Sequence, residues 1–93
     1  MLRIEALAID DHVLDKIESR HGVPFREVQE ACYSQQRHVR RGREGLYKVF
    51  SQTGGGRYLL VVLADVGGGV WRVVTARDMT QQERRLYRRE TGD

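Results

Sequence analysis

Two triple-glycine segments bracket the most apolar run of the chain. Gly54-Gly55-Gly56 and Gly67-Gly68-Gly69 stand on either side of residues 58–64, Tyr-Leu-Leu-Val-Val-Leu-Ala. A continuous apolar run of this length is typical of a strand that is covered on both faces. Glycine clusters between strand-like runs indicate hairpin loops, and neither cluster leads into a helix as a phosphate-binding glycine loop would. We therefore expect a sheet with residues 58–64 as a central strand.

Further runs with strand character lie before and after this segment. Residues 46–50, Leu-Tyr-Lys-Val-Phe, and residues 70–76, Val-Trp-Arg-Val-Val-Thr-Ala, contain the β-branched and aromatic residues that strands prefer. The basic segment 37–41 is another candidate strand. The weak alternation of residues 3–9 fits either a short strand or an extended lead-in. The sequence thus predicts three or four antiparallel strands.

Two helical patterns occupy the first third of the chain. Residues 11–20 place apolar side chains on one face, and Gly22 supplies the residue at which this helix ends. Pro24 can open a second helix in its first turn. The apolar stripe of that helix fades near residue 33 and consists of Phe25, Val28, Ala31 and Cys32.

A capping box indicates a third helix near the end of the chain. Thr80 is the expected N-cap, Glu83 reaches back to it, and the helix runs to about residue 90. Met79, Leu86 and Tyr87 are expected to face the sheet. The predicted fold class is α+β, with a small antiparallel sheet, two N-terminal helices and one C-terminal helix. The 93 residues are expected to form a single domain, residues 1–93.

Positive charge is concentrated in the last two thirds of the chain. Residues 1–30 carry four bases and seven acids, whereas residues 31–93 carry twelve bases and six acids. Fourteen of the sixteen bases are arginine, whose planar fork suits phosphate groups. This asymmetry indicates an anionic partner. A GC-rich genome that encodes arginine in place of lysine explains the arginine excess equally well.

Several classes of site and location are excluded by residue counts. The lone Cys32 excludes an internal disulfide framework and fits the reducing cytoplasm, and its place on an apolar stripe favours a core residue. His12, His21 and His38 lack metal-ligand spacing, so we expect no metal and no cofactor. No apolar run approaches the roughly 18 residues that a membrane-spanning helix needs. Arginine with histidine and a carboxylate suits metal-free RNA cleavage, although a basic binding module has the same composition.

Three stretches of the chain match a known group of small proteins in order and spacing. They are Arg20–Val28 (RHGVPFREV), Arg57–Val62 (RYLLVV) and Trp71–Arg77 (WRVVTAR), the last followed by Glu83–Tyr87 (ERRLY). Together they resemble the BrnT family of toxins, which have the RelE-like ribonuclease fold. The resemblance implies a cytoplasmic type II toxin, an endoribonuclease that inhibits translation. It also implies a cognate antitoxin with a ribbon-helix-helix DNA-binding pattern, and it leaves open whether the toxin is a homodimer.

The resemblance also implies roles for individual residues. Arg72 and Arg77 are expected to clamp the scissile phosphate, His21 or Glu83 to act as base or acid, and Tyr87 to complete the catalytic set. The expected RNA-binding residues are Lys16, Arg57, Arg40, Arg41 and Arg43.

Each catalytic candidate also has a structural interpretation. His21 can serve as a cation at a helix C-terminus, Arg77 can pair with Glu83 or Asp78, and Arg72 can be a solvated residue of the sheet. Tyr87 can pack in the core. The family's opening tryptophan is also missing from Ile9-Asp10-Asp11-His12. The alternative function is therefore a non-enzymatic RNA- or protein-binding module of the same fold, an inactive toxin relic.

Overall fold

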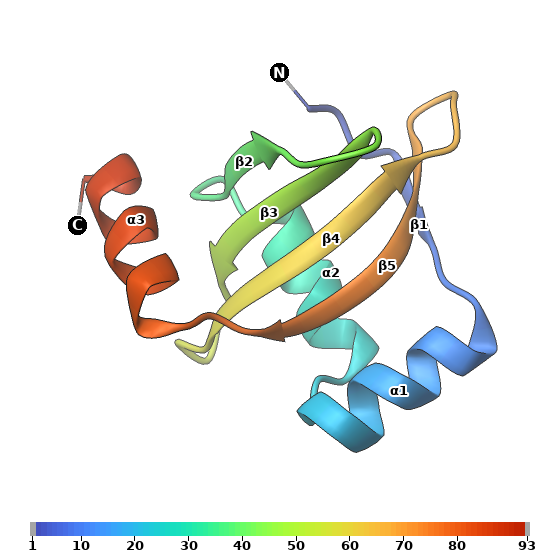
Figure 1. Cartoon of the computed structure of the whole chain (residues 1–93), viewed down its shortest axis with the longest axis horizontal. Helices are drawn as coiled ribbons and strands as arrows, with labels where there is room; N and C mark the ends of the chain where they lie inside the picture. Colours follow the sequence, from blue (N-terminus) through green and yellow to red (C-terminus); the bar gives the residue numbers. More distant parts are fainter. Residues whose placement is uncertain (1, 93) are drawn as a thin grey trace.

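The computed structural model describes residues 2–92, which contain three helices and five strands (Figure 1). The elements in chain order are β1 (Ala6–Ala8), α1 (Asp11–His21), α2 (Phe25–Tyr33), β2 (His38–Arg41), β3 (Leu46–Gln52), β4 (Tyr58–Asp65), β5 (Val70–Asp78) and α3 (Gln81–Thr91). This order confirms the α+β fold with two N-terminal helices and one C-terminal helix. None of the helices within residues 2–92 is long and apolar enough to cross a membrane.

All five strands form one sheet in the order β1-β5-β4-β3-β2. The apolar strand β4 is central, as its sequence predicts, and β2, β3, β4 and β5 pair with one another in antiparallel fashion. The sheet has more strands than the three or four expected, because β1 adds a fifth strand, which is parallel to β5. Backbone hydrogen bonds from Glu5 and Ala6 to the Gly69 carbonyl start this pairing. A three-residue strand that pairs across more than sixty residues leaves little trace in local sequence.

Glycine makes the two predicted hairpin loops possible. Gly67, Gly68 and Gly69 between β4 and β5 have φ values of 95°, 64° and 81°, and Gly56 between β3 and β4 has a φ of 92°. Residues with a Cβ rarely adopt positive φ values, which accounts for glycine at these turns. Both triple-glycine segments therefore act as hairpin loops, as expected.

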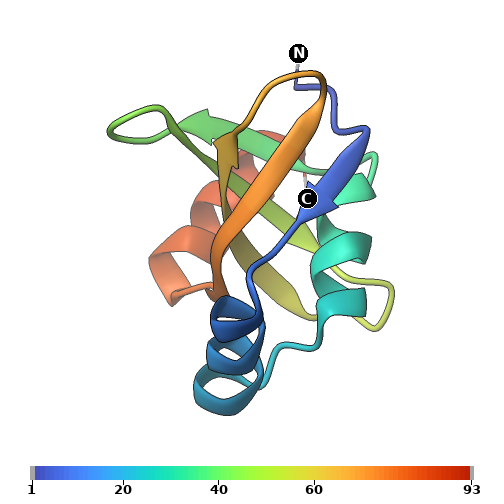
Figure 2. The same ribbon diagram turned by 90° about the vertical axis from the view of Figure 1, so that its right-hand side faces the viewer.

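Helices cover the two faces of the sheet unequally. Helix α2 packs on one face, here called the α2 face, and α3 packs on the other, the α3 face (Figure 2). Helix α1 lies against β5 and adds its apolar residues to the core of the α2 face. The larger core lies on the α2 face and consists of Val13, Ile17, Val23, Val28, Ala31, Cys32, Val49, Leu59, Val61, Leu63, Trp71, Val73 and Ala76. The smaller core under α3 consists of Phe50, Leu60, Met79 and Tyr87. Helix α3 thus covers only part of its face.

The helix ends follow the predicted signals closely. Gly22 is left-handed, with a φ of 62°, and its N–H bonds to the Glu18 carbonyl at the end of α1. Pro24 lies one residue before α2 rather than inside its first turn. At α3, the Glu83 N–H donates to the Thr80 hydroxyl at 3.2 Å and the Thr80 N–H donates to the Glu83 carboxylate at 2.8 Å. The predicted capping box is therefore confirmed.

Cys32 is a core residue on α2. Its side chain is fully buried, and this burial raises the pKa of the thiol to about 12. A thiol with such a pKa remains protonated and unreactive at neutral pH. The structure therefore supports the packing interpretation of this cysteine.

Candidate functional site

Strand register determines which side chains share the α3 face. Phe50 pairs with Leu60, Lys48 with Val62 and Leu46 with Ala64, so these residues lie on one side of β3 and β4. Ala64 is in turn paired with Arg72 on β5. Arg40 on β2 pairs with Lys48, and Thr75 on β5 pairs with Val62, so both residues also lie on this face.

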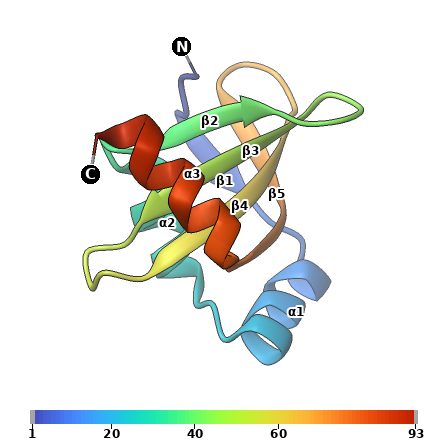
Figure 3. The same ribbon diagram turned by 60° about the vertical axis from the view of Figure 1, so that its left-hand side comes forward.

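Helix α3 leaves part of this face uncovered. It packs over Phe50, Leu60 and Tyr58, near the end of the sheet from which it starts (Figure 3). The remaining residues form a surface here called the open half of the sheet, which consists of Arg40, Leu46, Lys48, Val62, Ala64, Arg72 and Thr75. Its middle is made of small or apolar side chains, and its charged side chains stand around them. A flat, shallow surface of this kind can accept an extended chain.

Three cations of the open half have no intramolecular partner among residues 2–92. Arg40, Lys48 and Arg72 are exposed, and none makes an ion pair or a side-chain hydrogen bond within this part of the chain. The side of Arg72 was predictable, because it alternates with the buried Trp71 and Val73. Unpaired cations around an apolar floor favour binding of a polyanion over binding of a neutral ligand.

Two shallow depressions border these cations near the β2–β3 hairpin. One has a volume of about 600 Å³ and is lined by Arg41, Gly42, Arg43, Leu46, Lys48 and Val62. The other has a volume of about 560 Å³ and includes Arg72 together with Ala64 and Asp65. The expected RNA-binding residues Arg40, Arg41 and Arg43 therefore lie at or beside the open half. Arg41 is partly engaged, because its guanidinium donates to the Tyr47 hydroxyl at 3.1 and 3.2 Å.

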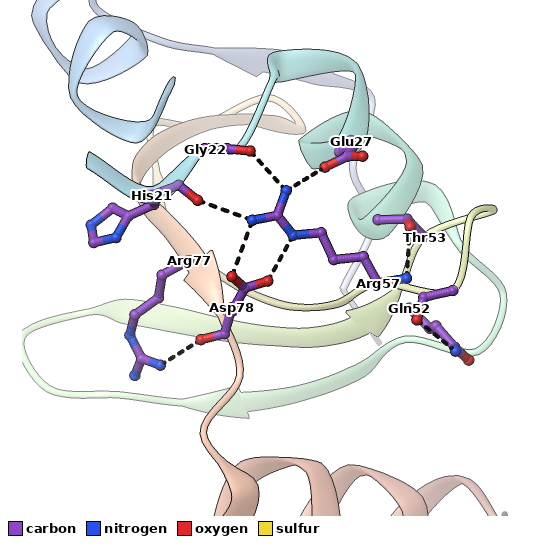
Figure 4. Close-up of polar contacts among 9 residues, drawn as sticks. His21, Gly22, Glu27, Gln52, Thr53, Arg57, Arg77 and Asp78 are labelled. Carbon is purple, nitrogen blue, oxygen red and sulfur yellow. Dashed lines mark hydrogen bonds and ion pairs between the residues drawn. The ribbon is translucent and has the colours of Figure 1, made fainter. Parts of the chain in front are cut away.

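Arg57 is engaged on all sides within the chain (Figure 4). Its five N–H groups donate to both oxygens of Asp78, to one oxygen of Glu27 and to the carbonyls of His21 and Gly22, over 2.6–3.1 Å. The bonds with Asp78 are the main reason that the pKa of this guanidinium is raised. Arg57 therefore joins α1, α2 and the end of β5, and it offers no further donor to RNA in this arrangement.

Arg77 and Glu83 pair with each other at the border of the open half. Arg77 donates to both Glu83 oxygens at 2.8 and 2.9 Å and to the Asp78 carbonyl at 3.0 Å. These contacts use three of its five N–H groups, so two donors remain for an added ligand. Hydrogen bonding from Arg77 lowers the pKa of the Glu83 carboxyl, against a smaller opposing effect of burial. Glu83 is thus held ionised, and its lowered pKa makes it a weaker proton acceptor than a free carboxylate.

The other predicted site residues lie away from the open half. Tyr87 is 2% exposed and packs edge-on against Tyr58. His21 ends α1, where its carbonyl accepts a bond from Arg57, and Lys16 is exposed on the same helix. Since α1 packs on the α2 face, the structure does not bring Lys16 to Arg72 or Lys48. The structural alternatives for His21, Arg77 and Tyr87 thus match their observed placement.

Two features of the site were absent from the sequence predictions. Lys48 belongs to the open half, and alternation with Tyr47 and Val49 could have placed it there. Tyr58 lies beneath two arginines of α3, with the guanidinium carbons of Arg84 and Arg88 at 4.8 and 5.5 Å from its ring centre. Arg84 and Arg88 are therefore packed against this ring, whereas Arg85 and Arg89 are exposed. Within residues 2–92 no group of three or more histidine, cysteine or acidic side chains could hold a metal ion.

Comparison with known proteins gives a clear structural likeness. No family model matches the sequence, and no curated protein is significantly similar to it in sequence. The crystal structure of the ribonuclease toxin BrnT from Brucella abortus matches with a TM-score of 0.69 and 15% identity. The match covers 82% of this chain and 97% of that one. The chain therefore has the BrnT toxin fold, as the sequence resemblance predicts.

The Arg57 contacts predict a large effect of a conservative substitution. Arg57→Lys keeps the charge but removes the planar fork, so most of the five hydrogen bonds are lost and acceptors near the end of α1 are left unpaired. We expect the free energy of unfolding in urea to fall by about 2–3 kcal/mol. Arg72→Lys, a matched change at an unpaired arginine, should alter it by less than about 0.5 kcal/mol. Equal urea midpoints for wild type and Arg57→Lys would show that the contacts carry no stability.

The paired carboxylates predict an acid-sensitive part of the stability. The Arg57 contacts lower the pKa of Asp78, and the Arg77 contacts lower that of Glu83, so both stabilise the fold in their ionised forms. This contribution is complete above the ordinary carboxyl pKa of about 4 and is lost as the pH falls through the lowered values. Glu83→Gln keeps a residue suited to the capping box. It should make the decline of unfolding free energy below pH 4 shallower, whereas the exposed Arg85→Gln should not; an unchanged slope in Glu83→Gln would contradict this.

Proposed function

We propose that this protein is a type II toxin that cleaves RNA on the open half of its sheet. The observation that carries the proposal is the set of three unpaired cations, Arg40, Lys48 and Arg72, on the part of the sheet that α3 leaves uncovered. A ribonuclease toxin has the same fold, which supports a role in RNA cleavage. An RNA backbone laid over Val62 and Ala64 would bring its phosphates to these three side chains.

The reaction that suits these residues needs no metal. The ribose 2′-oxygen attacks the adjacent phosphorus, a new O–P bond forms, and the bond from phosphorus to the 5′-oxygen breaks. A base takes the 2′-hydroxyl proton, an acid returns a proton to the leaving oxygen, and the products are a 2′,3′-cyclic phosphate and a 5′-hydroxyl. Arg72 and the two remaining donors of Arg77 would stabilise the added negative charge on the phosphate.

The proton-transfer roles are assigned to Glu83 and His21. Glu83 is proposed as the proton acceptor because it lies beside Arg77 at the border of the open half, and its lowered pKa makes it a weak base. His21 is proposed for the second proton transfer on the family resemblance alone; α1 packs with the other face of the sheet from Arg72. Tyr87 is proposed to act on the reaction only through packing under α3, because its side chain is 2% exposed.

The cellular setting follows from the same proposal. RNA cleavage by a toxin of this type would inhibit translation in the cytoplasm, and a cognate antitoxin would hold the protein inactive. A ribbon-helix-helix antitoxin encoded next to the toxin is the expected partner. A short neighbouring reading frame with that pattern would support this assignment.

A second function, RNA binding without cleavage, is favoured by one observation. Arg77 and Glu83 neutralise each other, and His21 lies on α1, which packs on the other face from Arg72. Under this alternative the protein is an inactive relic of the toxin fold. The open half would still bind the RNA backbone through Arg40, Lys48 and Arg72.

Cleavage of labelled single-stranded RNA in the presence of EDTA separates the two functions. The toxin proposal predicts products with a cyclic phosphate end, a rate lowered roughly 100-fold in Arg72→Ala, and an unchanged rate in Arg20→Ala on α1. Expression without a partner should also arrest bacterial growth.

Intact RNA with tight binding would establish the alternative instead. In that case the slope of log affinity against log salt should fall by about 0.7 in Arg72→Ala, and absence of both binding and cleavage would overturn both functions.

A further inference from the structure

The outer edge of β2 carries backbone groups with no partner in the sheet. β2 is the last strand on its side, and its only strand neighbour among residues 2–92 is β3. The Gly42 N–H bonds to the Leu46 carbonyl, which sets the alternation of bonded pairs along β2 and β3. Arg40 and His38 therefore bond to β3, whereas the N–H and C=O groups of Val39 and Arg41 point away from the sheet. This edge can accept one more strand.

A partly apolar depression lies on the α2 face next to the same edge. One hollow of about 510 Å³ is lined by Leu2, Tyr33, Ser34, Gln35, Arg37 and Val39. A second hollow of about 380 Å³ shares Leu2 and Val39 and adds Arg41 and Tyr47. Tyr33 is 48% exposed, so an aromatic ring here faces solvent. Apolar side chains from an added strand would reach these hollows on one face.

The other face of the edge is basic. Arg40 is exposed on the α3 face of β2 and unpaired within residues 2–92, and Arg43 is exposed in the following turn. Five bases and one acid lie between residues 37 and 48. A second copy of β2 would bring arginines against arginines, which disfavours self-pairing. An acidic strand meets no such repulsion.

We propose that the β2 edge binds an extended segment of a protein partner in which apolar and acidic residues alternate. The segment pairs its backbone with Val39 and Arg41, places its apolar side chains in the Leu2–Val39 hollows and places its acids beside Arg40. An antitoxin is the natural source of this segment, and in that identification the inference rests on the proposed function. The surface itself does not depend on RNA cleavage.

A defined peptide tests the surface directly. The probe is an acetylated eight-residue peptide of alternating valine and glutamate, added to the full chain labelled with ¹⁵N. We expect saturable binding, with slowed hydrogen exchange at the Val39 and Arg41 amides. The same peptide with lysine in place of glutamate should bind with a Kd at least roughly tenfold higher. A peptide that is N-methylated at the alternate residues whose N–H groups would pair with β2 should not bind.

Two protein variants separate this surface from the RNA site. Val39→Pro removes an outward N–H without removing a bond to β3, so it should abolish peptide binding and leave RNA binding intact. Arg72→Ala should weaken RNA binding and leave peptide binding unchanged. If Val39→Pro fails to fold, the N-methylated peptide provides the same test on the wild-type chain.

Three outcomes would overturn the inference. The first is absence of peptide binding. The second is peptide-induced shifts centred on Lys48 and Arg72, which would show charge attraction to the open half only. The third is protection of the Val39 amide that rises with protein concentration and without peptide, which would assign the edge to a second copy of this chain.

Discussion

One guanidinium joins three parts of this fold that are far apart in sequence. Arg57 stands just before β4 and satisfies two carbonyls at the C-terminal end of α1, where a helix leaves acceptors without intrahelical donors. The same group holds Glu27 on α2 and Asp78 at the end of β5. Because α3 begins three residues after Asp78, these contacts also fix the point from which α3 crosses the sheet. The extent of the open half depends on that starting point.

The arginines of this chain therefore divide into two groups by their contacts. Arg57 is fully engaged within the fold, Arg77 is engaged with Glu83, and Arg84 and Arg88 pack on Tyr58. Arg40 and Arg72, with Lys48, have no such partners among residues 2–92 and stand on the uncovered part of the sheet. Engaged arginines stabilise the fold, and unpaired ones are available to a polyanion. Arg20, Arg26 and Arg85 also have no side-chain partner among residues 2–92, so the open half is identified by the grouping of Arg40, Lys48 and Arg72 on one face of the sheet.

Much of the fold was predictable from local signals. The glycine loops, the central apolar strand and the Thr80 capping box are each encoded within a few neighbouring residues, and alternation around Trp71 placed Arg72 correctly. The Arg57 contacts were not predictable, because its partners lie 21 to 36 residues away in sequence. The parallel pairing of β1 with β5 was hidden for the same reason. Family motifs drew attention to Arg57 without distinguishing a structural role from a binding role.

We propose that the open half, and no other basic surface, meets the RNA backbone. Titration of the ¹⁵N-labelled chain with a 2′-O-methyl oligonucleotide, which cannot be cleaved at its 2′-oxygen, tests this by mapping chemical-shift changes. We expect changes centred on Arg40, Lys48, Val62 and Arg72, which weaken steeply as salt is raised. Changes confined to the outer arginines of α3, or to α1, would contradict it.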